Sequence, residues 1–269
     1  MNKDILKYVG DISQICGMKR YTFSDGFAKG VEAIDVDNGA LTFTVLVDRC
    51  MDIYSLKYNN IPIAFLSRTG VVAPAFYNER GTEWLRGFGA GFLTTCGFTQ
   101  VGDPCKIGDE IYGLHGRASF LPATLTQYLE NWENDSYIMT ISGKVRQSKH
   151  EFENIVLQRT IKCALGKNTI LLSDVIINEG VNSEPLMLLY HMNFGYPLLS
   201  PECEIIIPSE KIVGWDSFSQ DNLNSWNHMP EPTLNPRHTV HLHSPEKNSG
   251  RSLFSLRNTI DDKRIAVNV

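Results

Sequence analysis

The stretch Leu41-Thr-Phe-Thr-Val-Leu-Val47 decides the fold class of this 269-residue chain. Apolar side chains alternate with threonine and then run together, which is typical of a β-strand with one buried face, and its branched and aromatic residues favour strands. The charged pair Asp48-Arg49 follows directly. The stretch therefore predicts a strand that leads from a core to a functional surface, with an ion pair at the strand end as the structural alternative.

Further candidate strands follow at close spacing along the chain. Gly166-Lys-Asn168 predicts a tight hairpin, and the polar stretch Asn131–Ser136 predicts a turn. Helical periodicity is weak, and only Asp4–Val9 and Glu79–Arg86 are expected to form a helical turn or two. The other predicted strands are Ile61–Leu66, Tyr137–Val145, Ile155–Cys163, Thr169–Asn178, Leu186–His191, Glu204–Ile207, Thr239–His243, Arg251–Leu256 and Ile265–Val269. Dense strands without intervening helices predict an all-β sandwich or barrel.

Composition excludes several classes of protein. The chain has 25 basic and 30 acidic residues, and it shows no basic stripe, so neither nucleic acid nor an anionic membrane is an expected partner. No apolar run approaches the roughly 20 residues of a membrane helix, and Met1–Lys7 has no signal-peptide character. The six cysteines are scattered without a CxxC pair and are expected to be buried thiols. These features predict a soluble, cytoplasmic protein.

Two histidines are the strongest candidates for chemistry. His115 lies in Gly113-Leu-His-Gly-Arg117, and His191 lies in Tyr190-His-Met-Asn-Phe194. An imidazole with a pKa near about 6.5 can give and take a proton at neutral pH, as sugar-ring opening, ester cleavage or enolisation requires. Their spacing is not that of metal ligands. The structural alternative is that each histidine is a hydrogen-bonded residue beside a glycine.

Four motifs carry a family resemblance. They are Asp48-Arg-Cys-Met-Asp52, the stretch Trp84–Gly97, Leu114-His-Gly-Arg117 and His191-Met-Asn-Phe194. In this order the chain resembles the aldose 1-epimerase (galactose mutarotase-like) superfamily, and most of all its uncharacterised bacterial branch, from about Gly26 onward. The resemblance implies a large twisted antiparallel β-sandwich, an open site for a free monosaccharide, and neither a metal nor an organic cofactor. It leaves open whether the protein forms a homodimer.

The resemblance also implies roles for particular residues. His191 would be the acid that protonates the sugar ring oxygen, although Gly195 stands where galactose mutarotases usually have asparagine. His115 would bind the sugar near that oxygen and share the catalytic site.

The same resemblance implies a set of substrate-binding side chains. Arg49 or Arg117 would donate a forked pair of hydrogen bonds to sugar hydroxyls, a task that suits a rigid guanidinium. Asp48 and Asn193 complete the expected set. Arg117 replaces a glycine of the family, so the family's substrate preference does not carry over.

The sequence does not identify the general base of the proposed reaction. The family implies a glutamate near its C-terminus, whereas this sequence ends in the apolar Arg264–Val269. We therefore expect a single domain over residues 1–269 that lacks the family's last C-terminal strands. No spacing selects a substitute among Glu231, Asp216, Asp48 and Asp52. Glu231 is the first choice because the prolines on both sides fix its backbone.

Two other functions compete with an epimerase. His238-Thr-Val-His241-Leu-His243 followed by Glu246 resembles the metal-binding motif of the cupins, since His241 and His243 would share one strand face. The spacing to the glutamate is shorter than in cupins, and the preceding glycine pattern is absent, so a solvated strand face explains the histidines more simply. The remaining alternative is a sugar-binding protein without activity, which a missing base would favour.

Overall fold

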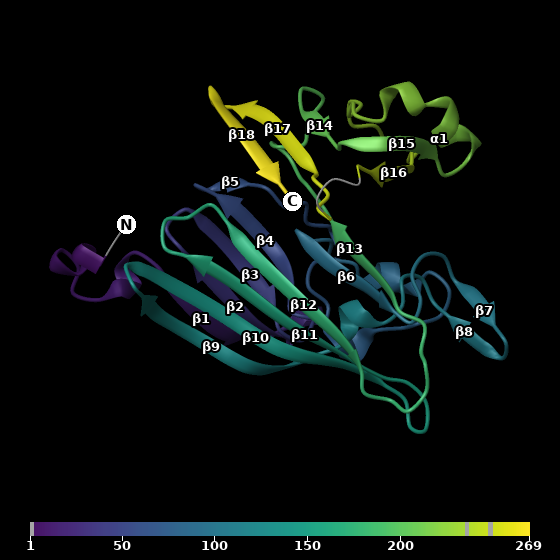
Figure 1. Ribbon diagram of the computed structural model, residues 1–269, viewed down its shortest axis with the longest axis horizontal. Helices are drawn as coiled ribbons and strands as arrows, with labels where there is room; N and C mark the ends of the chain where they lie inside the picture. Colours follow the sequence, from purple (N-terminus) through teal and green to yellow (C-terminus); the bar gives the residue numbers. More distant parts are fainter. Residues whose placement is uncertain (1–2, 235–236, 247–249) are drawn as a thin grey trace. The chain divides into compact units, whose positions relative to one another are not determined.

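The computed structural model describes residues 3–234, 237–246 and 250–269 (Figure 1). The chain divides into two compact units, Met1–Asn193 and Phe194–Val269, each with its own sheets. Nearly all regular structure consists of antiparallel strands, which confirms the prediction of an all-β fold. That the whole chain acts as one domain stays a prediction.

The first unit begins with a five-stranded antiparallel sheet. Its strands, in spatial order, are β1 (Gly17–Thr22), β2 (Glu32–Asp37), β3 (Leu41–Leu46), β4 (Asp52–Tyr58) and β5 (Ile61–Pro62). The strand predicted at Leu41–Val47 is β3, and its alternation is confirmed because Leu41, Phe43 and Val45 are buried. The strand predicted at Ile61–Leu66 is only the two-residue β5.

A four-stranded antiparallel sheet follows. Its strands, in spatial order, are β12 (Ile170–Asn178), β11 (Asn154–Ala164), β10 (Ser136–Ser148) and β9 (Ala123–Glu133). Burial alternates along β10 and β11, and Gly166 occupies the expected tight turn with a φ of 70°. The strands predicted at Tyr137–Val145, Ile155–Cys163 and Thr169–Asn178 are thereby confirmed.

These two sheets lie face to face in the first unit (Figure 1). The side-chain amide of Asn38, between β2 and β3, donates to the carbonyls of Ala164 and Lys167 at the turn between β11 and β12. At another point the N–H of Ala123 donates to the carbonyl of Val47. A buried cluster between the layers contains Cys50, Phe98, Ala118, Val145, Ile155 and Leu157. Val145, Ile155 and Leu157 of the four-stranded sheet thus pack with Cys50, which lies between β3 and β4.

A two-stranded ladder between these sheets carries the candidate site. Strand β6 (Leu93–Phe98) pairs antiparallel with β13 (Met187–Met192), and His191 lies opposite Thr94. The hairpin β7 (Cys105–Ile107) and β8 (Glu110–Tyr112) follows β6. Short 3-10 turns supply the remaining local structure: η1 (Lys3–Lys7), η2 (Ile12–Gln14), η3 (Gly26–Ala28), η4 (Pro74–Phe76), η5 (Glu83–Gly87) and η6 (Ala118–Phe120). The two predicted helical turns correspond to η1 and η5.

The second unit is small and also strand-rich. Strands β14 (Glu204–Ile206), β17 (Ser255–Ile260) and β18 (Lys263–Asn268) form one sheet, and β15 (Ser209–Gly214) pairs with β16 (His241–Pro245). Between them lie helix α1 (Ser217–Asp221) and the turn η7 (Leu223–Ser225).

Two strand predictions in this unit start too early. They were placed at Thr239–His243 and Arg251–Leu256, whereas β16 begins at His241 and β17 begins at Ser255. In β17 the register follows from the turn at Asp261 and Asp262, whose φ angles of 48° and 59° are those of a two-residue hairpin. Directly before Ser255, Phe254 exchanges two backbone hydrogen bonds with Val269, both at 2.9 Å.

The described ranges contain no helix that is long and apolar enough to cross a membrane. All six cysteines are free. Five are buried as predicted, but the prediction is wrong for Cys105, which is exposed because it lies on the β7–β8 hairpin outside the core.

Candidate functional site

The two candidate histidines lie beside each other. The centroids of the His115 and His191 rings are 5.9 Å apart, and the ring planes meet at 76°. Strand β6 positions both residues, because His191 pairs with Thr94 across the ladder and the carbonyl of His115 accepts the N–H of Gly97. One strand thus brings together two motifs that are far apart in the sequence.

Glycine allows the His115 segment to approach β6 closely. Gly97 and Gly116 have φ angles of 112° and 69° and form a bridge between their two segments. A Cβ on Gly116 would lie 2.5 Å from the carbonyl oxygen of Gln100, and one on Gly97 would lie 2.0 Å from that of Met187. Only glycine fits these positions without displacing the backbone. His115 itself has a φ of 58°, which is uncommon for a residue with a side chain.

A backbone hydrogen bond selects the tautomer of His115. The N–H of Gly102 donates to His115 Nδ1 at 3.3 Å, and the carbonyl of Gly102 accepts the His115 N–H at 2.9 Å. An amide N–H can only donate, so Nδ1 carries no proton while this bond exists. The neutral His115 ring therefore holds its proton on Nε2 and presents a hydrogen-bond donor there.

Aromatic side chains form a wall beside the histidine pair. The rings of Trp84 and His115 are 5.0 Å apart, those of Phe88 and His191 are 5.2 Å apart, and Trp84 stacks on Phe88 at 4.6 Å. Burial lowers the pKa of both histidines below the ordinary value of 6.5. A charge on His191 lowers the pKa of His115 further, although Asp103 opposes this effect. The pair therefore disfavours two positive charges at once.

Arg117 is available at the edge of this site. Its guanidinium forms an ion pair with Glu79 at 2.6 Å, and both side chains are more than one-third exposed. An ion pair this exposed adds little stability. The remaining guanidinium donors can therefore serve a ligand, and binding of sugar hydroxyls by Arg117 stays a prediction.

Arg49 and Asp48 both form hydrogen bonds with the backbone. Arg49 is buried, donates to the carbonyls of Ser119, Val72 and Gly87, and lies over the Phe120 ring at 3.9 Å. Burial lowers the pKa of Arg49 to about 10. The carboxylate of Asp48 accepts an N–H bond from the backbone of β2. Both side chains hold the segment between β3 and β4 in place, and their contact with sugar stays a prediction.

Asn193 also serves the backbone around His191. Its side-chain amide donates to the carbonyls of Gly91 at 2.8 Å and His191 at 3.1 Å. This contact ties the end of β13 to the loop before β6. The expected role of Asn193 in binding sugar stays a prediction.

The carboxylates proposed as the base have different surroundings. Glu231 is exposed in an irregular segment of the second unit, and its role as base stays a prediction. Asp216 caps α1 by accepting the N–H of Ser219 at 2.7 Å. Asp52 is buried in an ion pair with Arg159. Asp48, Asp52 and Asp216 thus each have a structural task.

The histidines of the cupin-like motif have protein partners. Nε2 of His241 lies 3.0 Å from the carbonyl of Ser219, and Nδ1 of His243 lies 3.0 Å from the hydroxyl of Ser209. The ring of His243 also lies edge-on to Trp226 at 4.6 Å. Across the described ranges, no group of three or more His, Cys, Asp or Glu side chains is arranged to hold a metal ion.

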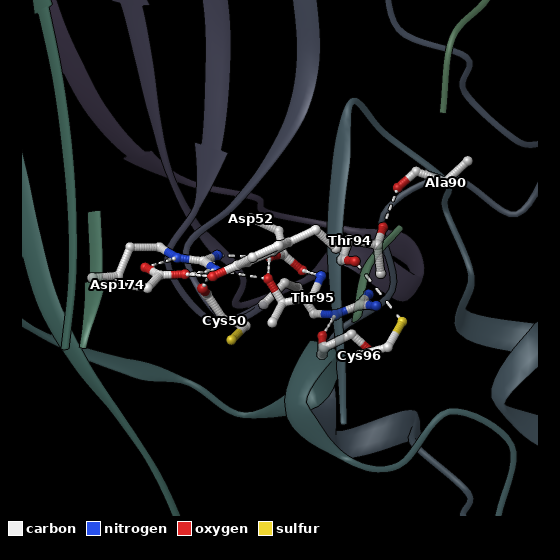
Figure 2. A network of polar contacts seen from close by, with 11 residues as sticks. Cys50, Asp52, Ala90, Thr94, Thr95, Cys96 and Asp174 are labelled. Atoms are coloured by element: carbon white, nitrogen blue, oxygen red, sulfur yellow. Dashed lines mark hydrogen bonds and ion pairs between the residues drawn. The ribbon is translucent and has the colours of Figure 1, made fainter. Parts of the chain in front are cut away.

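A buried polar network behind the ladder was not predicted. Arg159 of β11 donates through Nη1 to Asp52 at 2.9 Å, and through Nη2 to Thr95 and Asp174, both at 2.8 Å. Tyr190, next to His191, donates to Asp174 at 2.7 Å. Figure 2 shows Asp52, Thr95 and Asp174 around one guanidinium group. The sequence contains a signal for this network, because Arg159 lies on the same face of β11 as the buried Leu157 and Ile161.

Comparison with known proteins supports this architecture. One solved structure is provisionally named an aldose 1-epimerase from Klebsiella pneumoniae subsp. pneumoniae, with 24% identity, a TM-score of 0.84, and coverage of 100% of this chain and 70% of that one. A galactose mutarotase-like protein from Clostridium acetobutylicum has 13% identity, a TM-score of 0.60, and coverage of 90% and 78%. Galactose 1-epimerase from Lactobacillus acidophilus has 10% identity, a TM-score of 0.55, and coverage of 90% and 79%. The predicted galactose mutarotase-like fold is confirmed.

No curated protein matches the sequence. A family model described as "Domain of unknown function (DUF4432)" matches residues 28–269, which is most of the chain. The protein therefore belongs to this DUF4432 family.

Proposed function

We propose that the protein interconverts the anomers of a free aldose by acid–base ring opening. The observation that carries the proposal is the pairing of His115 and His191, with ring centroids 5.9 Å apart. It is supported by a fold shared with proteins named as aldose 1-epimerases.

The reaction moves protons and breaks one bond. A base takes the proton of the hydroxyl on C1, the freed electron pair forms a carbonyl there, and the bond from C1 to the ring oxygen breaks. An acid gives that oxygen a proton. Rotation about the C1–C2 bond and closure on the other face reverse these steps. The atoms and electrons balance without an oxidant, a reductant or a carrier.

The two histidines suit different roles in this reaction. His191 acts as the acid, and His115 stays neutral because burial and a charge on His191 both lower the pKa of His115. The Nε2–H of His115, set by the bond from Gly102, then donates to a sugar oxygen and orients the ring. Arg117 supplies further donors to hydroxyls.

A carboxylate is the expected base, and Glu231 is the first to test. The Glu231→Gln variant keeps the shape of the side chain and removes its basicity. If Glu231 is the base, the anomerisation rate falls about 10²–10⁴-fold, the usual contribution of one positioned proton-transfer group.

The central experiment measures anomerisation by NMR saturation transfer or polarimetry on a panel of aldoses. His191→Ala should reduce kcat by about 10²–10⁴-fold. His115→Asn, which suits the left-handed backbone, should raise KM as well because it removes a group that orients the sugar.

Two results would contradict parts of the proposal. If His191→Ala keeps the wild-type rate, His191 is not the acid. If the wild-type protein binds sugar but turns over no faster than buffer, the protein is a non-enzymatic sugar-binding protein.

A further inference from the structure

A pocket opens in the first unit beside Arg117. Its space is about 480 Å³, which includes the part that is open to solvent. Neither His115 nor His191 lines it. Its walls include Thr99, Tyr112, Arg117, Gln147, Glu153 and Glu184. The pocket is thus adjacent to the proposed site through Arg117, two residues after His115, and yet separate from the histidine pair.

A buried amide oxygen on the wall lacks a partner. Gln147 is 3% exposed, and its amide nitrogen donates to the hydroxyl of Thr99 at 2.9 Å and to Glu153 at 3.4 Å. Its Oε1 has no hydrogen-bond partner among the described residues. Leaving a buried acceptor unpaired is costly, so native structures rarely do so. The pocket is therefore suited to a ligand that brings a donor to this oxygen.

The charges on the wall point to the same kind of ligand. The carboxylate of Glu110 pairs with Lys149 at 3.0 Å, and Arg117 pairs with Glu79. In the described part of the chain, no ion pair neutralises Glu153 or Glu184. The wall thus has more acceptors than donors, and its negative charge opposes phosphate or carboxylate groups.

The position of the pocket indicates what could fill it. Thr94 lies opposite His191, and Thr99 lies on the pocket wall five residues later. At about 3.3 Å per residue these two positions are up to about 16 Å apart, so the Thr99 wall lies further along this segment than the position opposite His191. Tyr112 adds an aromatic surface of the kind that packs on a sugar ring.

We propose that this pocket is a second carbohydrate subsite, which binds a neutral, hydroxyl-rich sugar unit. The preferred substrate would then be a reducing disaccharide, with its reducing unit at the histidine pair and its other unit in the pocket. Sugar hydroxyls donate to Glu153, Glu184 and the unpaired Oε1 of Gln147. This inference rests on the proposed function for the placement of the reducing unit.

Isothermal titration calorimetry tests the pocket without turnover. The probes are lactose, maltose and cellobiose, with galactose and glucose as matched single sugars. Wild-type protein should bind at least one disaccharide more tightly than its component sugars. Glu184→Gln and Gln147→Leu should each reduce the ratio of disaccharide to monosaccharide affinity about tenfold, the value of one hydrogen bond to a charged or buried group.

Control variants separate this effect from general damage. Glu133→Gln makes the same chemical change on the exposed end of β9 and should leave the affinity ratio unchanged. Because Gln147 is buried, the melting temperature of Gln147→Leu is measured in parallel. If Gln147→Leu unfolds, the affinity ratio of Glu184→Gln alone tests the pocket, since Glu184 is only half-buried. Equal ratios for Glu184→Gln and wild type, or no preference for disaccharides, would overturn the inference.

NMR saturation transfer measures anomerisation and so tests the proposed epimerase activity separately from sugar binding in the pocket. Anomerisation of single sugars together with unchanged affinity ratios would refute the pocket and leave the epimerase proposal standing. Disaccharide binding that depends on Glu184, without anomerisation above buffer, would support the pocket and refute the epimerase.

Discussion

Arg159 of β11 and Asp52 of β4 form a buried ion pair, 2.9 Å from Nη1 to Oδ1, that joins the two main sheets of the first unit (Figure 2). Asp174 accepts a second, forked pair of bonds from the same guanidinium at 2.9 and 2.8 Å. Burial opposes the charge on Arg159, but the bonds to Asp174 and the charge of Asp52 outweigh it and raise the pKa of Arg159. The guanidinium therefore stays charged and depends on both carboxylates.

Removing one of these carboxylates should destabilise the fold. Asp52→Asn leaves the Arg159 charge with less compensation, and breaking a buried pair costs about 3–5 kcal/mol. We expect the free energy of unfolding, measured by urea denaturation, to fall by about 3 kcal/mol or more. The control is Glu83→Gln, which breaks the exposed pair with Arg86 and should cost no more than about 1 kcal/mol. Equal losses in the two variants would contradict a structural role for the buried pair.

The activity should depend on pH through His191. Burial lowers the pKa of His191 below 6.5, and an acid must hold its proton to act. We therefore expect kcat/KM to rise as pH falls from 8 through the lowered pKa of His191. This rise should be absent in His191→Ala. A profile that rises with pH in this range would instead identify His191 as the base.

The stability of the folded protein should decrease as pH falls, whereas kcat/KM increases. The unfolded His191 binds a proton near its ordinary pKa of 6.5, whereas the folded form binds it only at lower pH. The folded state is thus penalised as pH falls below about 6.5, with the same sign for His115. Rates at low pH are therefore compared only where the melting temperature shows the protein to be folded.

The strands that the sequence predicts best are those in which apolar and polar residues alternate. In β10 and β11 most inward positions are apolar and most outward ones polar, so the sequence alone locates both strands. β9 was missed because it is mostly exposed and its polar residues blur the alternation. β2 was missed because Glu32, Asp35 and Asp37 interrupt its apolar residues without a regular alternation, and β6 was missed because it is buried on both faces and therefore does not alternate.

The site was predictable in composition but not in assembly. The motifs around His115 and His191 identify both residues, but their proximity depends on the pairing of β6 with β13, a contact between distant segments that no local pattern encodes. The sugar-binding prediction for Arg49 rests on the family resemblance and on the chemistry of its guanidinium. Three backbone carbonyls surround its guanidinium in the folded chain, and a sequence cannot show them.

Metal removal should leave the activity unchanged. Ring opening by an acid and a base moves only protons, so the reaction needs no Lewis acid. We expect protein dialysed against a chelator to keep its anomerisation rate and to contain no stoichiometric zinc, iron or manganese by elemental analysis. One tightly held equivalent of metal that is lost in His241→Ala would favour the cupin-like interpretation.

Gly116 should be essential for placing His115. In Gly116→Ala the new Cβ meets the carbonyl oxygens of Gln100 and Gly97 at 2.5 and 2.8 Å, so the backbone must move away from β6 and carry the adjacent His115 with it. Gly108→Ala is the matched control, because Gly108 has a similar φ of 62° but no atom within 4 Å of an added Cβ. Both variants bear the backbone strain of a left-handed alanine, about 1–2 kcal/mol. Only Gly116→Ala should also lower kcat/KM, by about 10²-fold for a displacement near 1 Å. Calorimetric melting and NMR saturation transfer on both variants separate the two effects, and equal activity in the two would show that the position of His115 does not limit the reaction.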